Sequence, residues 1–127
     1  MSSDKIYQTD QFRHENKTWC RLLDFFKEEN TILKTRLSEV LDRSSDKEFL
    51  AMAELFQNKF IIKDEYIDEL LNDINKQEDE LGKTGDALPG KTLIKHQEKL
   101  RNEMEYFEKD FNTLKNGFNK YLSVSSL

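Results

Sequence analysis

Cysteine, proline and long apolar runs are nearly missing from this sequence, and the lack of cysteines and apolar runs argues against particular locations and kinds of structure. Cys20 is the single cysteine, so no intramolecular disulfide is available and a reducing, cytoplasmic setting is expected. No apolar run follows Met1, and none elsewhere approaches the length of a membrane span, so we expect neither secretion nor membrane insertion. The Glu-x-x-His pairs that ligate metal ions in di-iron helical bundles are missing too.

Charge is abundant but nowhere strongly basic, which argues against binding to nucleic acid. The net charge is −5, and 35% of the residues are charged. Residues 46–81 hold eleven acidic and four basic side chains, a net −7, whereas residues 82–127 hold six acidic and eight basic ones, a net +2. Nucleic-acid binding needs several Lys and Arg side chains that converge on phosphates. Nine Phe residues also distinguish the chain from a disordered one, because disordered chains are poor in aromatics.

Apolar side chains recur every seven residues along most of the chain, which predicts helices that each bury one face. The first row is Phe12, Trp19, Phe26, Leu33 and Val40. The last row is Leu93, Leu100, Phe107, Leu114 and Tyr121. A companion row in the first helix is interrupted by Asn16 and Asn30, whose amides we expect to set the register of the helices, as buried polar residues do in coiled coils.

The chain is therefore predicted to be all-α, an antiparallel, up-down-up bundle of three long helices at about 10–42, 46–81 and 91–122. We expect a single domain over residues 1–127, with flexible ends at 1–9 and 123–127. Three of the four glycines and the only proline fall within residues 82–92. This segment is the predicted interhelix loop.

Two local expectations follow from these boundaries. Ser45 and Glu48 have the spacing of a capping box, which predicts that Ser45 caps the second helix. Because sequential helices run antiparallel, Lys95 and Arg101 near the start of the third helix are expected to lie near acidic residues of the second. Exposed ion pairs of this kind favour one register more than they add stability.

Residues 85–92, GDALPGKT, match the pattern G-x-x-x-x-G-K-[ST] and so resemble the phosphate-binding loop of P-loop nucleotide-hydrolysing proteins. The resemblance implies that Gly85, Gly90, Lys91 and Thr92 would contact phosphate and magnesium. That family places the loop after a buried strand, whereas the residues before Gly85 are polar and acidic. We therefore prefer a surface turn between two helices, with an anion- or nucleotide-binding module as the alternative.

Two histidines raise the question of a metal site. His14 and His96 lie near the starts of the first and third helices, which an up-down-up topology brings to the same end of the bundle. Together with Glu15 they could bind zinc. Single histidines that are solvated or half-buried are far commoner, so we expect no metal and no cofactor.

The helices carry more apolar side chains than a three-helix core needs. The surplus consists of Phe25, Ile32, Leu55, Ile61 and Ile62. Either the helices turn their wide faces together and bury these residues, or the residues form a contiguous exposed patch, which in soluble proteins usually marks a partner surface. We predict a non-enzymatic interaction or scaffold protein that packs a helix face onto itself, as a homodimer, or onto a helical protein.

Overall fold

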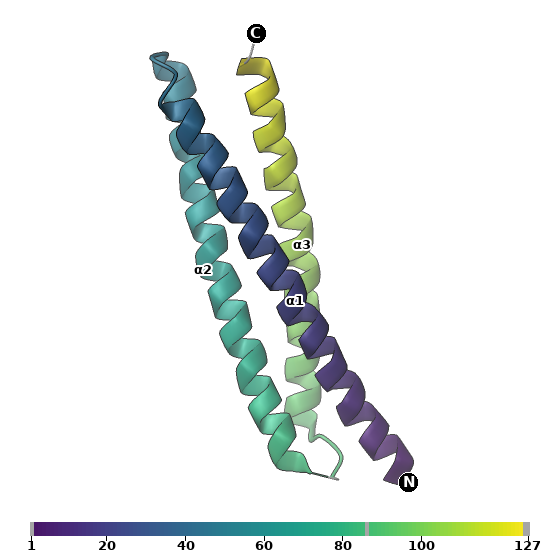
Figure 1. Ribbon diagram of the computed structural model, residues 1–127. Coiled ribbons are helices and arrows are strands. Elements are labelled where there is room, and N and C mark those ends of the chain that lie inside the picture. The colour runs from purple at the N-terminus through teal and green to yellow at the C-terminus, as the bar shows by residue number, and fades with distance from the viewer. Residues whose placement is uncertain (1, 86, 126–127) are drawn as a thin grey trace.

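The computed structural model describes residues 2–85 and 87–125 and consists of three long helices (Figure 1). Helix α1 spans Ser2–Leu41, α2 spans Lys47–Thr84 and α3 spans Lys91–Ser125. Two short connections reverse the chain direction, so sequential helices run antiparallel (Figure 1). No strand occurs in either described segment. The prediction of an all-α, three-helix bundle is thus confirmed.

The helices are longer than predicted. Helix α1 begins at Ser2 rather than near residue 10, so residues 2–9, expected to be flexible, are helical. Thr9, two turns into α1, is only 8% exposed, so tertiary packing that local sequence does not reveal begins ahead of the predicted start near residue 10. Helix α3 likewise continues to Ser125. Met1 and residues 126–127, the remainder of the predicted flexible ends, lie outside the described residues.

The ends of α2 differ from the prediction for local reasons. Asp46, not Ser45, is the N-cap: its extended backbone lets its carboxylate accept a hydrogen bond from the backbone N–H of Glu48 at 3.1 Å. Asp and Ser cap helices about equally well, so composition could not choose between them. At the other end α2 runs through Gly82 and ends at Gly85, whose φ of 57° lies in the left-handed region. The loop is therefore shorter than the predicted 82–92.

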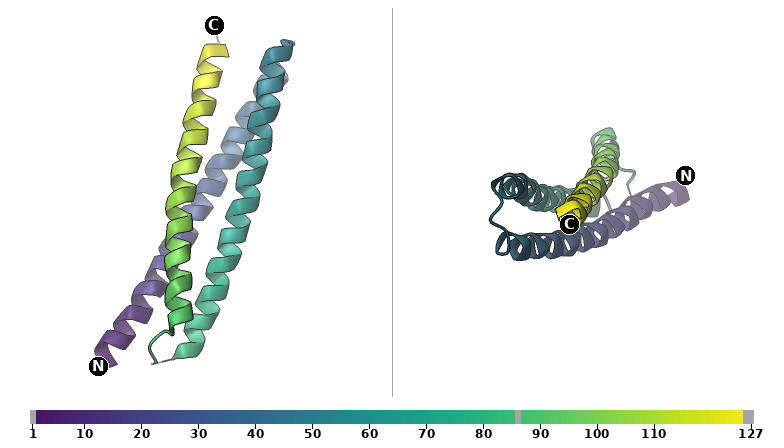
Figure 2. Two further views of the ribbon diagram at one scale, coloured as in Figure 1. Left: turned by 180° about the vertical axis from the view of Figure 1, so that it is seen from behind. Right: turned by 90° about the horizontal axis from the view of Figure 1, so that it is seen from above.

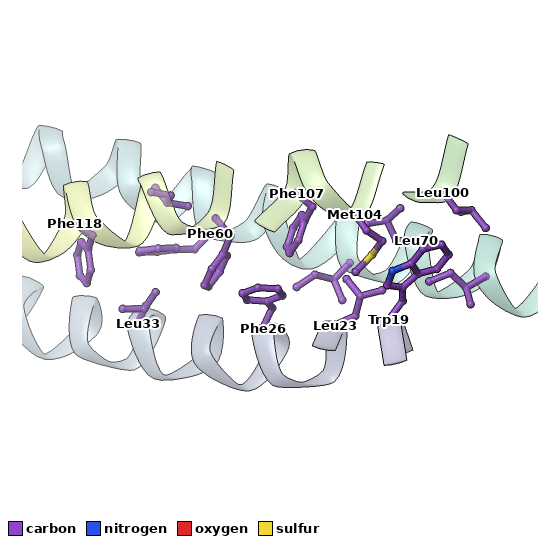
Figure 3. Packing of buried hydrophobic residues seen from close by; sticks show 14 of the residues in the cluster. Trp19, Leu23, Phe26, Leu33, Phe60, Leu70, Leu100, Met104, Phe107 and Phe118 are labelled. Atoms are coloured by element: carbon purple, nitrogen blue, oxygen red, sulfur yellow. The ribbon is translucent and has the colours of Figure 1, made fainter. Parts of the chain in front are cut away.

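Aromatic side chains fill the core between the three helices (Figure 3). Phe26 of α1 lies against Phe107 and Phe111 of α3, with ring centroids 5.4 and 5.0 Å away. Phe60 of α2 stands edge-on to Phe118 of α3 at 5.0 Å. Such ring pairs contribute about 0.5–1.5 kcal/mol beyond the burial of their area. The aromatic rows therefore hold α3 against both other helices.

The acidic side chains of α2 pair with α1, not with the start of α3 as predicted. Lys27 Nζ lies 2.7 Å from Asp68 Oδ1, and Lys34 pairs with Asp64 in the same way. Both lysines lie on the flank of α1 that faces α2, and they are seven residues apart in sequence. Arg101 of α3, which was expected to face α2, instead binds a carboxylate of α1.

The two ends of the bundle have different chemistry. The polar end is where α1 begins and residues 85–90 join α2 to α3 (Figure 1); its buried side chains include the amides Asn16, Gln77 and Gln97. The aromatic end is where residues 42–46 join α1 to α2 and where α3 finishes (Figure 1). Partly buried rings lie there, including the stack of Phe49 on Tyr121, with centroids 4.8 Å apart.

Candidate functional site

The densest polar cluster lies inside the polar end and joins all three helices. Gln97 of α3 donates from Nε2 to Glu15 Oε1 and to Asn16 Oδ1 of α1, each at 2.9 Å. Gln77 of α2 donates from Nε2 to Gln97 Oε1 at 3.1 Å and to the Leu93 carbonyl at 2.9 Å. Asn16, Gln77 and Gln97 are each at most 1% exposed. We call these three residues the amide layer.

Hydrogen bonds give every amide in the layer one orientation. Both hydrogens of Gln77 Nε2 are donated, so Gln77 Oε1 accepts, and His96 Nδ1, which lies 2.7 Å from it, must donate. At the other end of the layer, Asn16 donates from Nδ2 to Glu78 Oε1 at 2.8 Å. One continuous path of hydrogen bonds therefore runs, donor to acceptor, from the His96 imidazole through Gln77, Gln97 and Asn16 to the Glu78 carboxylate.

Two arginines hold the carboxylates that border the amide layer. Arg101 binds Glu15 with Nε and Nη2, each 2.8 Å from a carboxylate oxygen, and its hydrogen bond to Glu15 raises the pKa of the guanidinium. Arg13 Nε lies 3.3 Å from Glu78 Oε2. A bidentate arginine is held more strongly than a single contact. The two carboxylates that border the layer are therefore held by arginines, and the whole cluster fixes the axial register of the helices.

The predicted zinc site is not assembled around the amide layer. His14 is exposed, whereas His96 is half-buried and bound to Gln77. Glu15, the proposed third ligand, is engaged by Arg101 and Gln97. Across residues 2–85 and 87–125, no group of three or more His, Cys, Asp or Glu side chains could hold a metal ion.

The residues that resemble a phosphate-binding loop serve as helix ends. Gly85 terminates α2, and the carbonyl of Gly90 accepts the N–H of Ile94 at 3.1 Å, which starts α3. Lys91 and Thr92 are exposed in the first turn of α3. The segment that would be a strand in a P-loop protein is the long helix α2. The resemblance therefore stops at the residue letters and lacks its structural setting.

All five surplus apolar residues are exposed. Phe25, Ile32, Leu55, Ile61 and Ile62 each retain between 44% and 58% of their accessible surface. Of the two alternatives, the helices do not bury these residues by turning their wide faces together. Met52 belongs with them, because it is 46% exposed and lies three residues before Leu55, on the same side of the helix. Sequence reasoning missed Met52, although that spacing was available.

The surplus residues form two stripes rather than the single patch that was expected. The α1 stripe, Phe25 and Ile32, borders Glu29, which pairs with Lys115 of α3. The α2 stripe is Met52, Leu55 and Ile62. Ile62 borders Tyr66, whose ring is 5.6 Å from that of Phe107 in α3. Each stripe therefore flanks a contact with α3, and α3 lies between them.

Ile61 belongs to neither stripe, although it is exposed beside Ile62. Successive residues of an α-helix are rotated by about 100°, so Ile61 points away from the side of α2 that bears Leu55 and Ile62. The position of α3 between the stripes, together with this rotation of Ile61, keeps the five residues from forming one continuous patch. The spacing of surplus residues on each helix was readable from the sequence, but the position of α3 was not.

Three weak acids, one on each helix, are kept protonated by their surroundings. Burial raises the pKa of the Cys20 thiol, and the nearby carboxylates of Asp24 and Glu78 raise it further. Burial also raises the pKa of Tyr66 and of Tyr121. Because the thiolate is the reactive form of cysteine, Cys20 is poorly placed for nucleophilic chemistry.

The amide layer was missed as a unit by sequence reasoning. Gln77 and Gln97 stand in rows that are otherwise apolar, and this interruption was the visible sign. That they meet Asn16 depends on the axial offsets of the three helices, which sequence spacing does not provide.

Comparisons with known proteins add no further assignment. The chain has no significant match among family models, curated proteins or solved structures. Within the described segments, each helix lacks an apolar stretch long enough to cross a bilayer.

Proposed function

We propose that this chain is a non-enzymatic interaction protein that packs an exposed helix face onto a helical surface, either a second copy or another protein. The observation that carries the proposal is the pair of apolar stripes, whose side chains are about half exposed. Exposed apolar patches in soluble proteins commonly mark partner sites. Burying a fully exposed Leu, Ile or Phe side chain contributes roughly 1.5–3 kcal/mol. A half-exposed residue contributes less, so several must act together.

The amide layer supports the same proposal from the inside of the bundle. Its donors and acceptors bond to one another and to bordering residues, so they hold the helices in one register. Buried polar residues act in this way in coiled coils, where they select register while adding little stability. A fixed register keeps each stripe at a constant position relative to α3. We also propose a reducing, cytoplasmic location, because Cys20, the single cysteine, is half-buried and carries a free thiol.

The proposal is tested by comparing what binds to three charge-matched variants. The first carries Phe25→Glu and Ile32→Glu, the second Leu55→Glu and Ile62→Glu. The third carries Asn72→Glu and Asn112→Glu at exposed polar positions of α2 and α3. Each variant gains two negative charges, so a general charge effect would appear in all three. Affinity capture under native conditions and sedimentation of the purified chains measure association with other proteins and with itself.

We expect at least one stripe variant to lose an association that the wild-type chain and the Asn72/Asn112 variant retain. A loss confined to stripe variants shows that the apolar face makes the contact, because all three variants differ from wild type by the same charge. If the two stripe variants retain every association of the wild-type chain, or if the control loses the same ones, the proposed function is wrong. Far-UV circular dichroism confirms that each variant keeps its helices.

A further inference from the structure

An apolar groove lies between α2 and α3 near the aromatic end of the bundle, and we call it the α2–α3 groove. Its volume is about 340 Å³. It is lined by Met52, Phe56, Gly117, Lys120, Tyr121 and Val124. Small-molecule sites have volumes of about 300–1,000 Å³, whereas an added helix is about 10–12 Å across with its side chains. The groove therefore fits one narrow chain rather than a further helix.

Gly117 keeps one wall of the groove open. Glycine is among the least favourable residues inside a helix, and Gly117 lies within α3. A Cβ added there meets no atom within 4 Å, so no packing contact among the described residues requires the glycine. Because Gly117 lines the groove together with Phe56, a longer side chain at this position would fill space between the two helices. The glycine therefore leaves room for a ligand at a cost in helix stability.

The two helical segments that form the groove are basic, although the whole chain has a net charge of −5. Residues 49–63 and 111–125 together hold four lysines and one acidic residue, a net +3. Two of the four lysines are engaged by carboxylates of other segments. The other two, Lys59 and Lys120, make no ion pair with any residue that the structure describes. Their positive charge is therefore not neutralised within the described bundle.

Both of these lysines lie at the groove. Lys120 belongs to its lining, and Lys59 Nζ lies 5.9 Å from the centroid of the Phe56 ring, which forms part of the α2 wall. Glu54, the one acidic residue of the two segments, is two residues from Phe56, a rotation of about 200° that places it on another side of α2. An anion in the groove would therefore meet a lysine from each helix and no carboxylate of the lining.

A larger hollow continues the groove towards the end of the bundle. It has a volume of about 900 Å³ and shares Met52, Tyr121 and Val124 with the groove. Asp46 and Glu48 line this hollow, and their carboxylates would repel an anion. The charged head of an anionic ligand therefore belongs at the lysines, and its apolar part extends towards the shared residues.

From these observations we infer that the α2–α3 groove binds a free fatty acid, a single alkyl chain that ends in a carboxylate. The alkyl chain lies against Met52, Phe56 and Val124. The carboxylate accepts hydrogen bonds from Lys59 and Lys120, and such bonds between charged groups are stronger than those between neutral ones. This inference goes beyond the proposed function, and Met52 is the one residue that the groove shares with the α2 stripe.

Isothermal titration calorimetry of the full chain with dodecanoate, kept below its micelle concentration, tests the inference. We expect saturable binding at sub-millimolar concentration. Shortening the ligand to decanoate and octanoate should raise the Kd by about two- to fourfold for each methylene removed. Dodecyltrimethylammonium, which has the same alkyl chain and the opposite charge, should bind more than about tenfold more weakly. A general attraction to this acidic protein would favour the cation instead.

A matched pair of glycine variants locates the bound alkyl chain. Gly117→Leu fills the groove and should raise the Kd for dodecanoate by more than about tenfold. Gly82→Leu makes the same change at an exposed glycine of α2 outside the groove and should leave the Kd within about twofold. At both positions an added Cβ meets no atom within 4 Å, so both variants should keep or raise the Tm. Weaker binding by Gly117→Leu at an undiminished Tm therefore reports a filled groove.

Lysine variants test how the carboxylate is held. Lys59→Gln combined with Lys120→Gln should raise the Kd for dodecanoate by about tenfold. The control, Lys91→Gln combined with Lys95→Gln, removes the same charge at exposed positions near the start of α3. It should leave the Kd within about twofold, because these lysines lie at the opposite end of the helix.

Several results would overturn the inference: no saturable binding of dodecanoate, equal affinity for the cation, or a Kd indifferent to Gly117→Leu. Sedimentation with vesicles of anionic phospholipid, without binding of dissolved dodecanoate, also overturns it, because the groove residues would then contact a membrane surface. A chain that binds no fatty acid but whose stripe variants lose a protein partner overturns this inference alone. Fatty-acid binding by a chain whose stripe variants lose no association supports this inference and overturns the proposed function.

Discussion

At the scale of single residues, the amide layer shows how polar groups are accommodated in an apolar core. Asn16, Gln77 and Gln97 are fully buried, and each makes hydrogen bonds to another member or to a bordering residue. A satisfied hydrogen bond adds only about 0.5–1.5 kcal/mol, whereas a buried group left without its partner costs about 1–3 kcal/mol. The layer therefore matters most when one member is removed and the others remain.

A single replacement in the layer is expected to cost more than replacing the whole layer. Gln97→Leu leaves Asn16 Oδ1 without its donor and Gln77 with an unused hydrogen, so the free energy of unfolding should fall by about 2–4 kcal/mol. The triple variant Asn16→Leu, Gln77→Leu and Gln97→Leu removes all three amides and should lie within about 1 kcal/mol of wild type.

Urea unfolding followed by circular dichroism measures both changes. The residues that border the layer, Glu78 and His96, keep access to solvent, so the triple variant does not strand them. If the triple variant instead loses as much stability as the three single variants added together, the amides stabilise the core independently and the coupled layer is wrong.

At the scale of helices, the sequence predicted the three helices and their buried faces well, but it predicted poorly which neighbouring helix each flank contacts. The seven-residue rows identified which face of each helix is buried, because burial follows a period that the sequence displays. Helix ends were less accurate: Thr9 is buried by packing that its local sequence does not reveal, and α2 continues through the exposed Gly82 although glycine disfavours helix interiors. The partner of Arg101 was mispredicted for a related reason: spacing within a helix does not reveal which neighbour its flank faces.

Two glycines provide a matched test of what helix geometry requires. Gly117 lies inside α3, and a Cβ added there meets no atom within 4 Å, so Gly117→Ala should raise the free energy of unfolding by about 1 kcal/mol. Gly85 ends α2 with a φ of 57°, where a Cβ strains the backbone, so Gly85→Ala should lower it by about 1–2 kcal/mol.

The same atoms are added in both glycine variants, so the opposite signs report backbone conformation alone. Differential scanning calorimetry of the two variants beside wild type measures the shifts in Tm. Destabilisation by Gly117→Ala would show that this part of α3 needs close approach by another segment, and stabilisation by Gly85→Ala would contradict the described end of α2.

At the scale of the whole molecule, the chain combines a polar end, where buried amides join the three helices, with an aromatic end, where rings of α2 and α3 pack together. The end view in Figure 2 shows the three helices diverging rather than running parallel. Weak acids on all three helices have raised pKa values, mainly because they are buried and partly because carboxylates surround them. Their effects on stability have the same sign, so they add.

Stability is expected to fall in alkaline solution. An acid whose pKa is raised by folding keeps its proton at a pH where the same group in the unfolded chain has lost it. The free energy of unfolding therefore decreases as pH increases. The contribution is fully present below the ordinary values of 9.0 for Cys20 and 10.0 for Tyr66 and Tyr121, and it is lost as pH rises above them. The urea concentration at the midpoint of unfolding, measured from about pH 8 to pH 11, should decrease as this contribution is lost.

Tyr66→Phe is the informative variant for this pH dependence, because it removes one titrating group while keeping the ring beside Phe107. The decline between about pH 10 and pH 11 should become shallower in this variant. A stability that stays constant or increases across that range in the wild-type chain would contradict the raised pKa values.

The single orientation of the amide layer also constrains how this sequence can change over generations. Gln77, Gln97 and Asn16 each supply a donor or an acceptor that only the others use, so a substitution at one position passes through a less stable protein unless another follows. Exposed polar positions such as Asn72 carry no such dependence. Descendants of this chain should therefore keep the three amides together or replace them together with apolar residues, and mixed combinations should be rare.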